Sequence, residues 1–277
     1  MSTATGADLA SVVAWGGFAI AFVFGAIANK TNFCTMGAIS DIVNMGHWGR
    51  MRMWLLAIAV AVAASAALSL TGLVDLTKSV VQRPVLPWLS LMLGGLVFGI
   101  GMTLAGGCAN KNLVRLGGGS LRSLVVLVFM GIASYMTLKG LFGQWRATWL
   151  DPVSIDLAAS GWKDQSLGTA LSRMGGLDGR TSQIAVAALV ALALLVFTLN
   201  DKRFRGNAQQ LIGGAVLGLL VAAGWYLSGH LGYGENPETL ETVFHGTNSR
   251  ALESLSFVGP VAYGLELLML WTDKSLH

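Results

Sequence analysis

The hydrophobic residues of this chain are gathered into seven runs separated by short polar loops. An apolar run of about 18 or more uncharged residues predicts a membrane-spanning helix. Backbone polar groups in lipid must be satisfied within their own segment, and no run alternates like a barrel strand. The runs are Leu9 to Asn29, Met53 to Val74, Pro84 to Asn110, Ser123 to Leu138, Thr181 to Asn200, Gly206 to Gly234 and Ser254 to Leu265. The pattern predicts an all-α integral membrane protein, a polytopic helical bundle, in which the fourth and seventh runs are the shortest.

Composition agrees with a lipid environment. Of 277 residues, 54% are hydrophobic and 12% are charged, about half of the roughly 25% charged share of soluble domains. The net charge of +4 does not indicate nucleic-acid binding, because the basic residues lie in separate short loops rather than in one patch. Such loops are typical of the cytoplasmic side of a membrane protein, where they face anionic lipid.

The basic loops also predict an orientation. Three of them mark the cytoplasmic side, and the acidic sequence ENPETLETV marks the outside. The N-terminus is then outside and the C-terminus inside. The polar segment 139–180, which carries Trp145, Trp149 and Trp162, is predicted to be an outer interfacial loop. The basic loops contain Arg50 and Arg52; Lys111, Arg115 and Arg122; and Lys202, Arg203 and Arg205.

An internal repeat relates the two cysteines of the chain. At an offset of 74 residues, FGAIANKTNFC (Phe24 to Cys34) superposes on FGIGMTLAGGC (Phe98 to Cys108). Each copy continues into small or polar residues, a basic loop and another apolar run, as duplicated transporter halves do. We therefore interpret 1–277 as a single transmembrane domain with repeat units 9–74 and 84–138, an outer polar loop 139–180 and an incomplete second half 181–277.

A break is predicted inside the third run, which is longer than the roughly 20 residues needed to span a bilayer. It falls at Ala105-Gly106-Gly107, because adjacent glycines are costly in a helix. A short helix then starts near Cys108, and its free N–H groups favour an anion. Cys34, preceded by Thr31 and Asn32, is the matching site. The sequence thus predicts broken, re-entrant half-helices that carry Cys34 and Cys108.

Two interpretations of the cysteines stay open at this point. A cysteine in an apolar helix is usually a small, unreactive hydrophobe, but two at equivalent breaks favour a place on a solute path. They could also form one disulfide. Thiol catalysis is disfavoured, since no histidine or carboxylate lies within two residues of either to act as a base. The four histidines show no metal-ligand spacing, so we predict no enzyme, no metal and no cofactor.

Three charged residues near the apolar runs also have two interpretations. Lys30 either extends its amine to the interface or attracts an anion toward Cys34. Asp41 either marks a pathway or faces Arg50 in the basic loop. Glu266 is a carboxylate near membrane depth, which is expensive and often marks a pathway.

The sequences NFCTMGAISD (32–41) and GIGMTLAGGCANKNLVRLGGGS (99–120), the latter running into SLRSLVVLV, resemble the YeeE/YedE-like family of bacterial inner-membrane sulfur-compound transporters. The resemblance extends across most of the chain. It implies half-helices that meet near the membrane centre and an inward path for thiosulfate or a related sulfur anion, lined by cysteines that correspond to Cys34 and Cys108. The residues that we place on this path are Cys34, Cys108, Gly106, Gly107, Asn110, Lys30 and Asn32.

The chain departs from the family pattern in its second half. The family has a further glycine-cysteine motif there, with a third cysteine on the path. SFVGPVAYGLELL, Ser256 to Leu268, looks like a degenerate counterpart of NFCTMGAISDIV and has no cysteine. Either the chain is truncated, or it is a shortened member that pairs with another copy as a homo- or hetero-oligomer.

Three functions follow as hypotheses. The first is a multi-pass permease of the bacterial inner membrane for thiosulfate or a related sulfur anion, which could pass its cargo to a cytoplasmic sulfur-carrier or rhodanese-type protein. The second is a membrane thiol protein that relays sulfur through a persulfide or disulfide. The third is a non-transporting subunit completed by another chain.

Overall fold

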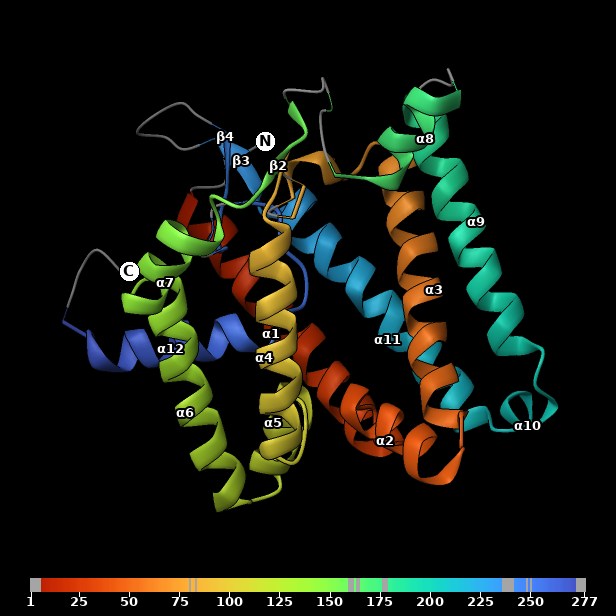
Figure 1. The fold of residues 1–277 in the computed structure, drawn as a ribbon, viewed down its shortest axis with the longest axis horizontal. Coiled ribbons are helices and arrows are strands. Elements are labelled where there is room, and N and C mark those ends of the chain that lie inside the picture. The colour runs from red at the N-terminus through yellow and green to blue at the C-terminus, as the bar shows by residue number, and fades with distance from the viewer. Residues whose placement is uncertain are drawn as a thin grey trace. The chain divides into compact units, whose positions relative to one another are not determined.

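The computed structural model describes residues 6–79, 81–82, 84–158, 162, 165–175, 179–235, 242–247, 249 and 251–272. These residues are mostly helical (Figure 1). Contacts divide the chain into two compact units. The first comprises Met1–Phe33, Ala38–Pro84 and Leu157–Leu255, and the second comprises Cys34–Gly37, Val85–Asp156 and Ser256–His277.

Six segments of the described chain are long and apolar enough to cross a membrane. Each overlaps one of the first six predicted runs, and the first extends well beyond its run, from Asp8 to Met45 instead of Leu9 to Asn29. The seventh run differs from the prediction, because it forms the helix α12, Val258–Met269, of only 12 residues. At a rise of 1.5 Å per residue, 12 residues extend about 18 Å, whereas the hydrocarbon core is about 30 Å thick. The six segments are Asp8–Met45, Gly49–Leu70, Trp88–Gly117, Leu121–Leu138, Gly179–Leu199 and Ala208–Leu231.

The first unit is built around α3, which packs against both α9 and α11, while α1 packs against α11 (Figure 1). Met53 and Leu56 of α3 and Phe204 of α10 form its buried apolar cluster. Side chains cap the starts of α10 and α11: Asp201 accepts a hydrogen bond from the Arg203 N–H, and Asn207 accepts one from the Gln210 N–H. The helices are α1 (Gly6–Thr31), α2 (Thr35–Met45, from Ala38 onward in this unit), α3 (Gly49–Leu70), α8 (Leu167–Gly175), α9 (Gly179–Leu199), α10 (Lys202–Arg205) and α11 (Ala208–Tyr226).

Shorter elements complete the first unit. A 3-10 turn covers Leu76–Lys78, and a π-helical turn, Leu227–Leu231, extends α11. Strands β3, Tyr233–Glu235, and β4, Thr242–Phe244, pair antiparallel with Tyr233 opposite Phe244. Most of the acidic loop that was predicted to lie outside, residues 236–241, falls outside the described residues.

Glycines on α11 allow the close approach of α3. A β-carbon on Gly218 would lie 2.5 Å from the backbone oxygen of Ala57, and one on Gly214 would lie 2.8 Å from the backbone oxygen of Met53. Both distances are shorter than a real carbon–oxygen contact. The glycines of the sixth run therefore serve backbone packing, as small residues do between membrane helices.

Substituting Gly218 by valine is expected to destabilise the protein by about 3 kcal/mol, at the upper end of overpacking effects, because the rigid backbone of α3 would have to move. The apparent melting temperature in detergent measures this. Gly99→Val on α4 is the matched control, since a β-carbon there meets no atom within 4 Å. Equal melting temperatures for the two variants would contradict the close α3–α11 packing.

The second unit is built around α6, which contacts α5, α7 and α12. Ser120 caps α6 by accepting a hydrogen bond from the Ser123 N–H. On α6, a β-carbon on Gly131 would lie 2.3 Å from Cδ1 of Leu265, so α12 packs closely there. The helices are α4 (Trp88–Leu104), α5 (Ala109–Gly117), α6 (Leu121–Leu138), α7 (Leu141–Trp145) and α12, with a π-helical turn at Arg146–Leu150.

Strands β1, Val85–Leu86, and β2, Ile155–Asp156, pair antiparallel within the second unit. The segment 139–180, predicted as an outer polar loop, thus contains α7, the π-helical turn, β2, α8 and the start of α9. On α4 the outcome differs from that on α11. A β-carbon on Gly94, Gly95, Gly99 or Gly101 would meet no atom within 4 Å among the described residues, so these glycines do not mark a close helix contact.

Candidate functional site

The first candidate feature is the turn that ends α1 just before Cys34. The Asn32 N–H donates to the Asn29 carbonyl at 3.3 Å, and the Phe33 N–H donates to the Ala28 carbonyl at 3.0 Å. This pair of hydrogen bonds is the Schellman motif, which needs a left-handed residue after the helix. Asn32 is this left-handed residue, with φ of 53°. Among the described residues it is the only one other than glycine with a positive φ. Asparagine tolerates this conformation better than other side chains do.

The turn that ends α4 repeats this geometry just before Cys108. The Gly106 N–H donates to the Thr103 carbonyl at 3.2 Å, and the Gly107 N–H donates to the Met102 carbonyl at 3.1 Å. Gly106 has φ of 68°. Helix α4 ends at Leu104 and α5 begins at Ala109, at the break that the paired glycines predict. Asn32 and Gly106 thus occupy matching positions, each two residues before a cysteine. The re-entrant character of α2 and α5 stays a prediction.

The two cysteines meet within the second unit. Their Sγ atoms lie 3.3 Å apart, close enough for a thiol–thiol hydrogen bond in which either can be the donor. Both thiols are free, and the exposed fractions are 6% for Cys34 and 8% for Cys108. The structure therefore brings together two buried residues that are 74 positions apart in the sequence.

Both sulfurs also lie at the start of a short helix. Cys34 immediately precedes α2, and its Sγ accepts a hydrogen bond from the Gly37 N–H at 3.4 Å. Cys108 is the N-cap residue of α5, with no side-chain cap hydrogen bond. Asn110, in the first turn of α5, is buried. First-turn N–H groups and the positive end of the helix dipole favour a negative ligand, so two such ends converge on the sulfur pair.

Polar side chains of α5 hold the Gly106-Gly107 turn in place. The Asn112 amide nitrogen donates to the carbonyls of Gly107, at 3.1 Å, and Cys108, at 3.3 Å. The Arg115 guanidinium donates to the Gly106 carbonyl at 2.8 Å. The turn that carries Cys108 is therefore fixed by the helix that follows it, which keeps the sulfur at a defined position.

Lys30 and Asn32, the remaining predicted path residues, lie in the first unit. Both line a polar pocket of about 470 Å³. Lys30 is exposed, and its backbone carbonyl accepts a hydrogen bond from the Gln209 amide at 2.6 Å.

The two carboxylates that were candidates for a pathway both take part in ion pairs. Asp41 is 4% exposed, and both of its oxygens accept hydrogen bonds from Arg50. The structure therefore agrees with the interpretation in which Asp41 faces Arg50. Glu266 is 5% exposed and accepts hydrogen bonds from Lys139, at 2.7 Å, and from the Tyr135 hydroxyl, at 3.2 Å. The hydrogen bond to Glu266 raises the pKa of the Lys139 amine.

Comparison with known proteins decides the family. The family model described as "Sulphur transport" matches residues 30–277, which include both cysteines. The chain belongs to this sulphur transport family. With six segments long and apolar enough to span a bilayer, this family member is a multi-pass membrane protein.

Two curated relatives are named as thiosulfate transporters. The chain is 28% identical to the thiosulfate transporter TsuA of Spirochaeta thermophila over 182 residues, 64% of this chain and 53% of the relative. It is 27% identical to the thiosulfate transporter TsuA of Escherichia coli over 129 residues, 47% of this chain and 34% of the relative. The matches thus span about half of one relative and about a third of the other.

Sequence reasoning missed several residues of these sites. Asn112 and Arg115 hold the Cys108 turn, but on the sequence they read only as polar and basic loop residues. The Glu266–Lys139 pair joins residues 127 positions apart, and no local pattern signals it. The helical spacing of Cys108 and Asn112, four residues apart on one helix face, is a signal that could have identified Asn112.

Proposed function

We propose that this protein carries thiosulfate or a related small sulfur anion across the bacterial inner membrane. The path is lined by Cys34, Cys108, the Gly106-Gly107 turn and Asn110, and it includes Lys30 and Asn32. The observation that carries the proposal is the buried sulfur pair, 3.3 Å apart, at the starts of two short helices. Membership of the sulphur transport family and two relatives named for thiosulfate support the choice of cargo.

The chemistry of the pair suits this cargo. Thiosulfate is a dianion with a soft terminal sulfur. Helix N-termini attract its charge, and thiols are weak donors that contact a soft sulfur without holding it tightly. A conducting path needs binding strong enough for entry and weak enough for release. Neutral thiols and backbone dipoles meet both needs better than a cluster of arginines at the same place.

The matching turns support an architecture of duplicated units. In each, a helix ends in a left-handed residue, a cysteine follows two positions later, and a short helix begins. Unwound backbone at membrane depth is tolerated where it lines a cavity or is buried in protein. On this proposal α2 and α5 are the half-helices of two repeat units in one transmembrane domain, and a cytoplasmic sulfur-carrier or rhodanese-type protein accepts the cargo.

A second candidate function is favoured by the contact between the two thiols. In a membrane thiol protein, one thiolate could attack the outer sulfur of thiosulfate, breaking its S–S bond, forming a persulfide and releasing sulfite. The neighbouring thiolate could then take over this sulfur and regenerate the first thiol, and an acceptor thiol could remove it in the same way. Intact-mass analysis after exposure to thiosulfate separates the two functions: an added sulfur atom on the protein supports the relay, and an unchanged mass supports the carrier.

The test of the carrier function is uptake of ³⁵S-labelled thiosulfate by proteoliposomes that contain the purified chain. Uptake is expected to exceed that of protein-free vesicles. Unlabelled thiosulfate and selenium analogues should compete well, and sulfate should compete poorly, since it lacks the soft terminal atom. Absence of uptake, or equal competition by sulfate, would refute the proposal; uptake restored only by a second chain would support a subunit that another chain completes.

A further inference from the structure

Two adjoining pockets lie at the start of α11 in the first unit. The larger, of about 470 Å³, contains Lys30 and Asn32 in its lining, and the smaller has a volume of about 210 Å³. They share His47, Asn207 and Gln210 in their linings, so they adjoin. We call the two together the α11 pocket. A water takes about 30 Å³ of liquid volume, so the α11 pocket has room for a small oxyanion with part of its hydration shell.

The loops that form this pocket are two of the basic loops of the sequence. One leads into the first turn of α3, which carries Arg50 and Arg52, and the other lies between α9 and α11 and carries Arg203 on α10. The structure joins them through an ion pair between Arg52 and Asp201 and an edge-to-face contact between the rings of Trp48 and Phe197. By the distribution of basic residues, both loops are predicted to lie on the cytoplasmic side.

The charges around the α11 pocket favour an anion. Asp41 and Arg50 neutralise each other through two hydrogen bonds, and the Arg52–Asp201 pair does the same. Lys30 and Arg203 then leave the lining with a net positive charge. Asn207 caps α11 at this point, and the positive end of a 19-residue helix adds to the attraction.

Arg52, one of the residues that line the smaller pocket, has a donor without a partner among the described residues. The Nε–H of Arg52 is buried and makes no hydrogen bond within the described part of the chain, although Nη1 of the same guanidinium pairs with Asp201. A buried donor left without a partner costs free energy. An oxygen of a bound oxyanion would satisfy it.

Gly49 keeps the shared part of the pocket open for polar side chains. A β-carbon there would lie 2.6 Å from Cε1 of His47 and 3.1 Å from the Gln210 amide oxygen. The absence of a side chain at Gly49 therefore allows the imidazole and the amide to occupy the place where the two pockets meet. Both groups are able to donate a hydrogen bond to an anion.

The geometry points to the α11 pocket as a binding site for a small tetrahedral oxyanion, in addition to the cysteine pair. Lys30 supplies charge from the larger pocket, and the Nε–H of Arg52 supplies a directed donor in the smaller one. The identification of this oxyanion as the transported thiosulfate rests on the proposed function. Sulfate has a similar shape and the same charge, and the experiment below distinguishes thiosulfate from sulfate.

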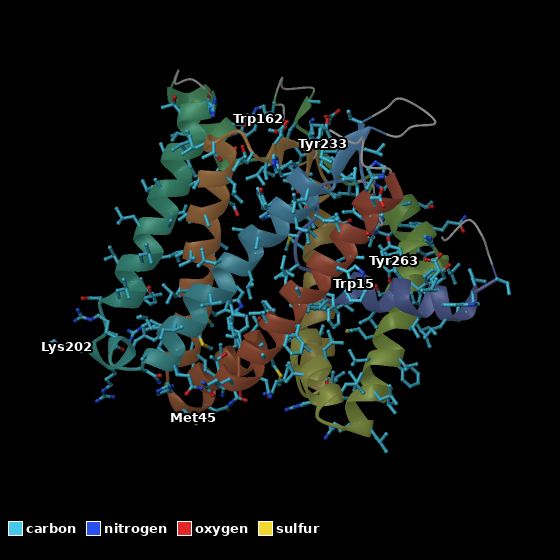
Figure 2. All side chains as sticks on the ribbon, turned by 180° about the vertical axis from the view of Figure 1, so that it is seen from behind. Trp15, Met45, Trp162, Lys202, Tyr233 and Tyr263 are labelled. Atoms are coloured by element: carbon cyan, nitrogen blue, oxygen red, sulfur yellow. The ribbon has the colours of Figure 1, made fainter. Side chains whose placement is uncertain are left out.

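The test is equilibrium binding of ³⁵S-labelled thiosulfate and, separately, labelled sulfate to the purified full chain in nanodiscs at constant ionic strength. Arg52→Lys keeps the charge beside Asp201 and removes the Nε donor, so affinity should fall about tenfold. Lys30→Gln should lower affinity about threefold, since an exposed charge is screened. Lys202→Gln is the control, because Lys202 lies on α10 at the edge of the first unit and outside the lining of both pockets (Figure 2).

Unchanged affinity in both pocket variants overturns the inference. An equal fall in affinity in Lys202→Gln also overturns it, because the anion would then respond to surface charge in general and not to the α11 pocket. If Arg52→Lys does not fold, Lys30→Gln alone decides.

The double variant Cys34→Ala, Cys108→Ala should still bind the labelled anion. If it loses all binding, the inference fails and the cysteine path stands. If that variant instead binds and also transports at the normal rate, the proposed path fails and the α11 pocket stands. Preference for thiosulfate identifies a cargo site, and equal binding of sulfate identifies a general oxyanion site.

Discussion

Replacing Cys108 by alanine is expected to lower the initial rate of thiosulfate uptake at least about tenfold, and Cys34→Ala should do the same. Each substitution removes one of two adjacent thiols from a buried position. Hydrogen bonds to charged groups contribute about 1.5–3 kcal/mol, and 1.4 kcal/mol corresponds to a factor of ten. The measurement is uptake by proteoliposomes with equal amounts of folded protein.

Serine at the same position provides a graded comparison. Cys108→Ser keeps a donor of similar size but replaces a soft atom by a hard one, so its uptake should lie between that of alanine and that of the unchanged protein. Helical content and melting temperature of each variant exclude a folding defect. Normal uptake by both alanine variants would mean that the thiols only fill space between helices.

Oxidation of the cysteine pair is expected to abolish uptake. A disulfide bond is about 2.05 Å long, and the Sγ atoms are 3.3 Å apart, so a movement of a little over 1 Å joins them. Copper-phenanthroline accepts the two electrons, and two protons leave with the loss of both thiols. The bond removes both S–H donors and closes the space between the sulfurs.

Two readouts together test this expectation. After oxidation, the intact mass of the protein with both cysteines should fall by two hydrogen atoms. The variants that keep only one cysteine should show no such fall. Dithiothreitol should restore both mass and uptake. Full uptake by protein whose mass shows complete oxidation would place the cargo path elsewhere, and failure of the bond to form would contradict the proximity of the sulfurs.

The breaks before the cysteines could be predicted because their cause is local. Paired glycines at 106 and 107 signal a helix end by backbone entropy alone. Asn32 is a weaker signal of the same kind, since asparagine tolerates the left-handed region without requiring it. The six long apolar segments follow from run length, which is also local. The seventh run was predicted wrongly as a span because an apolar stretch of 12 residues fits either a short buried helix or the end of a span.

The contacts between distant parts of the chain could not be predicted. The sequence offers Asp41 a partner nine residues away, in Arg50, but gives no sign that Glu266 meets Lys139. Glycine content alone did not distinguish α11, where a β-carbon on Gly218 would collide with the backbone of α3, from α4, where one on Gly99 would meet no atom of the described residues within 4 Å. The α11 pocket combines α1, the start of α3 and the start of α11. Its Gln209–Lys30 hydrogen bond crosses 179 positions, a distance at which periodicity carries no information.

The left-handed residues at the two breaks differ in one respect that bears on transport. Glycine could adopt the left-handed conformation at either position, but the chain has glycine at 106 and asparagine at 32. The backbone therefore has the same conformation at both turns. The turn before Cys34 carries the side-chain amide of Asn32, whereas the turn before Cys108 has no side chain at Gly106. On the proposed path, an ion meets a side-chain amide at the turn before Cys34 and only peptide groups at the turn before Cys108, so the two turns differ in polarity although their backbones match.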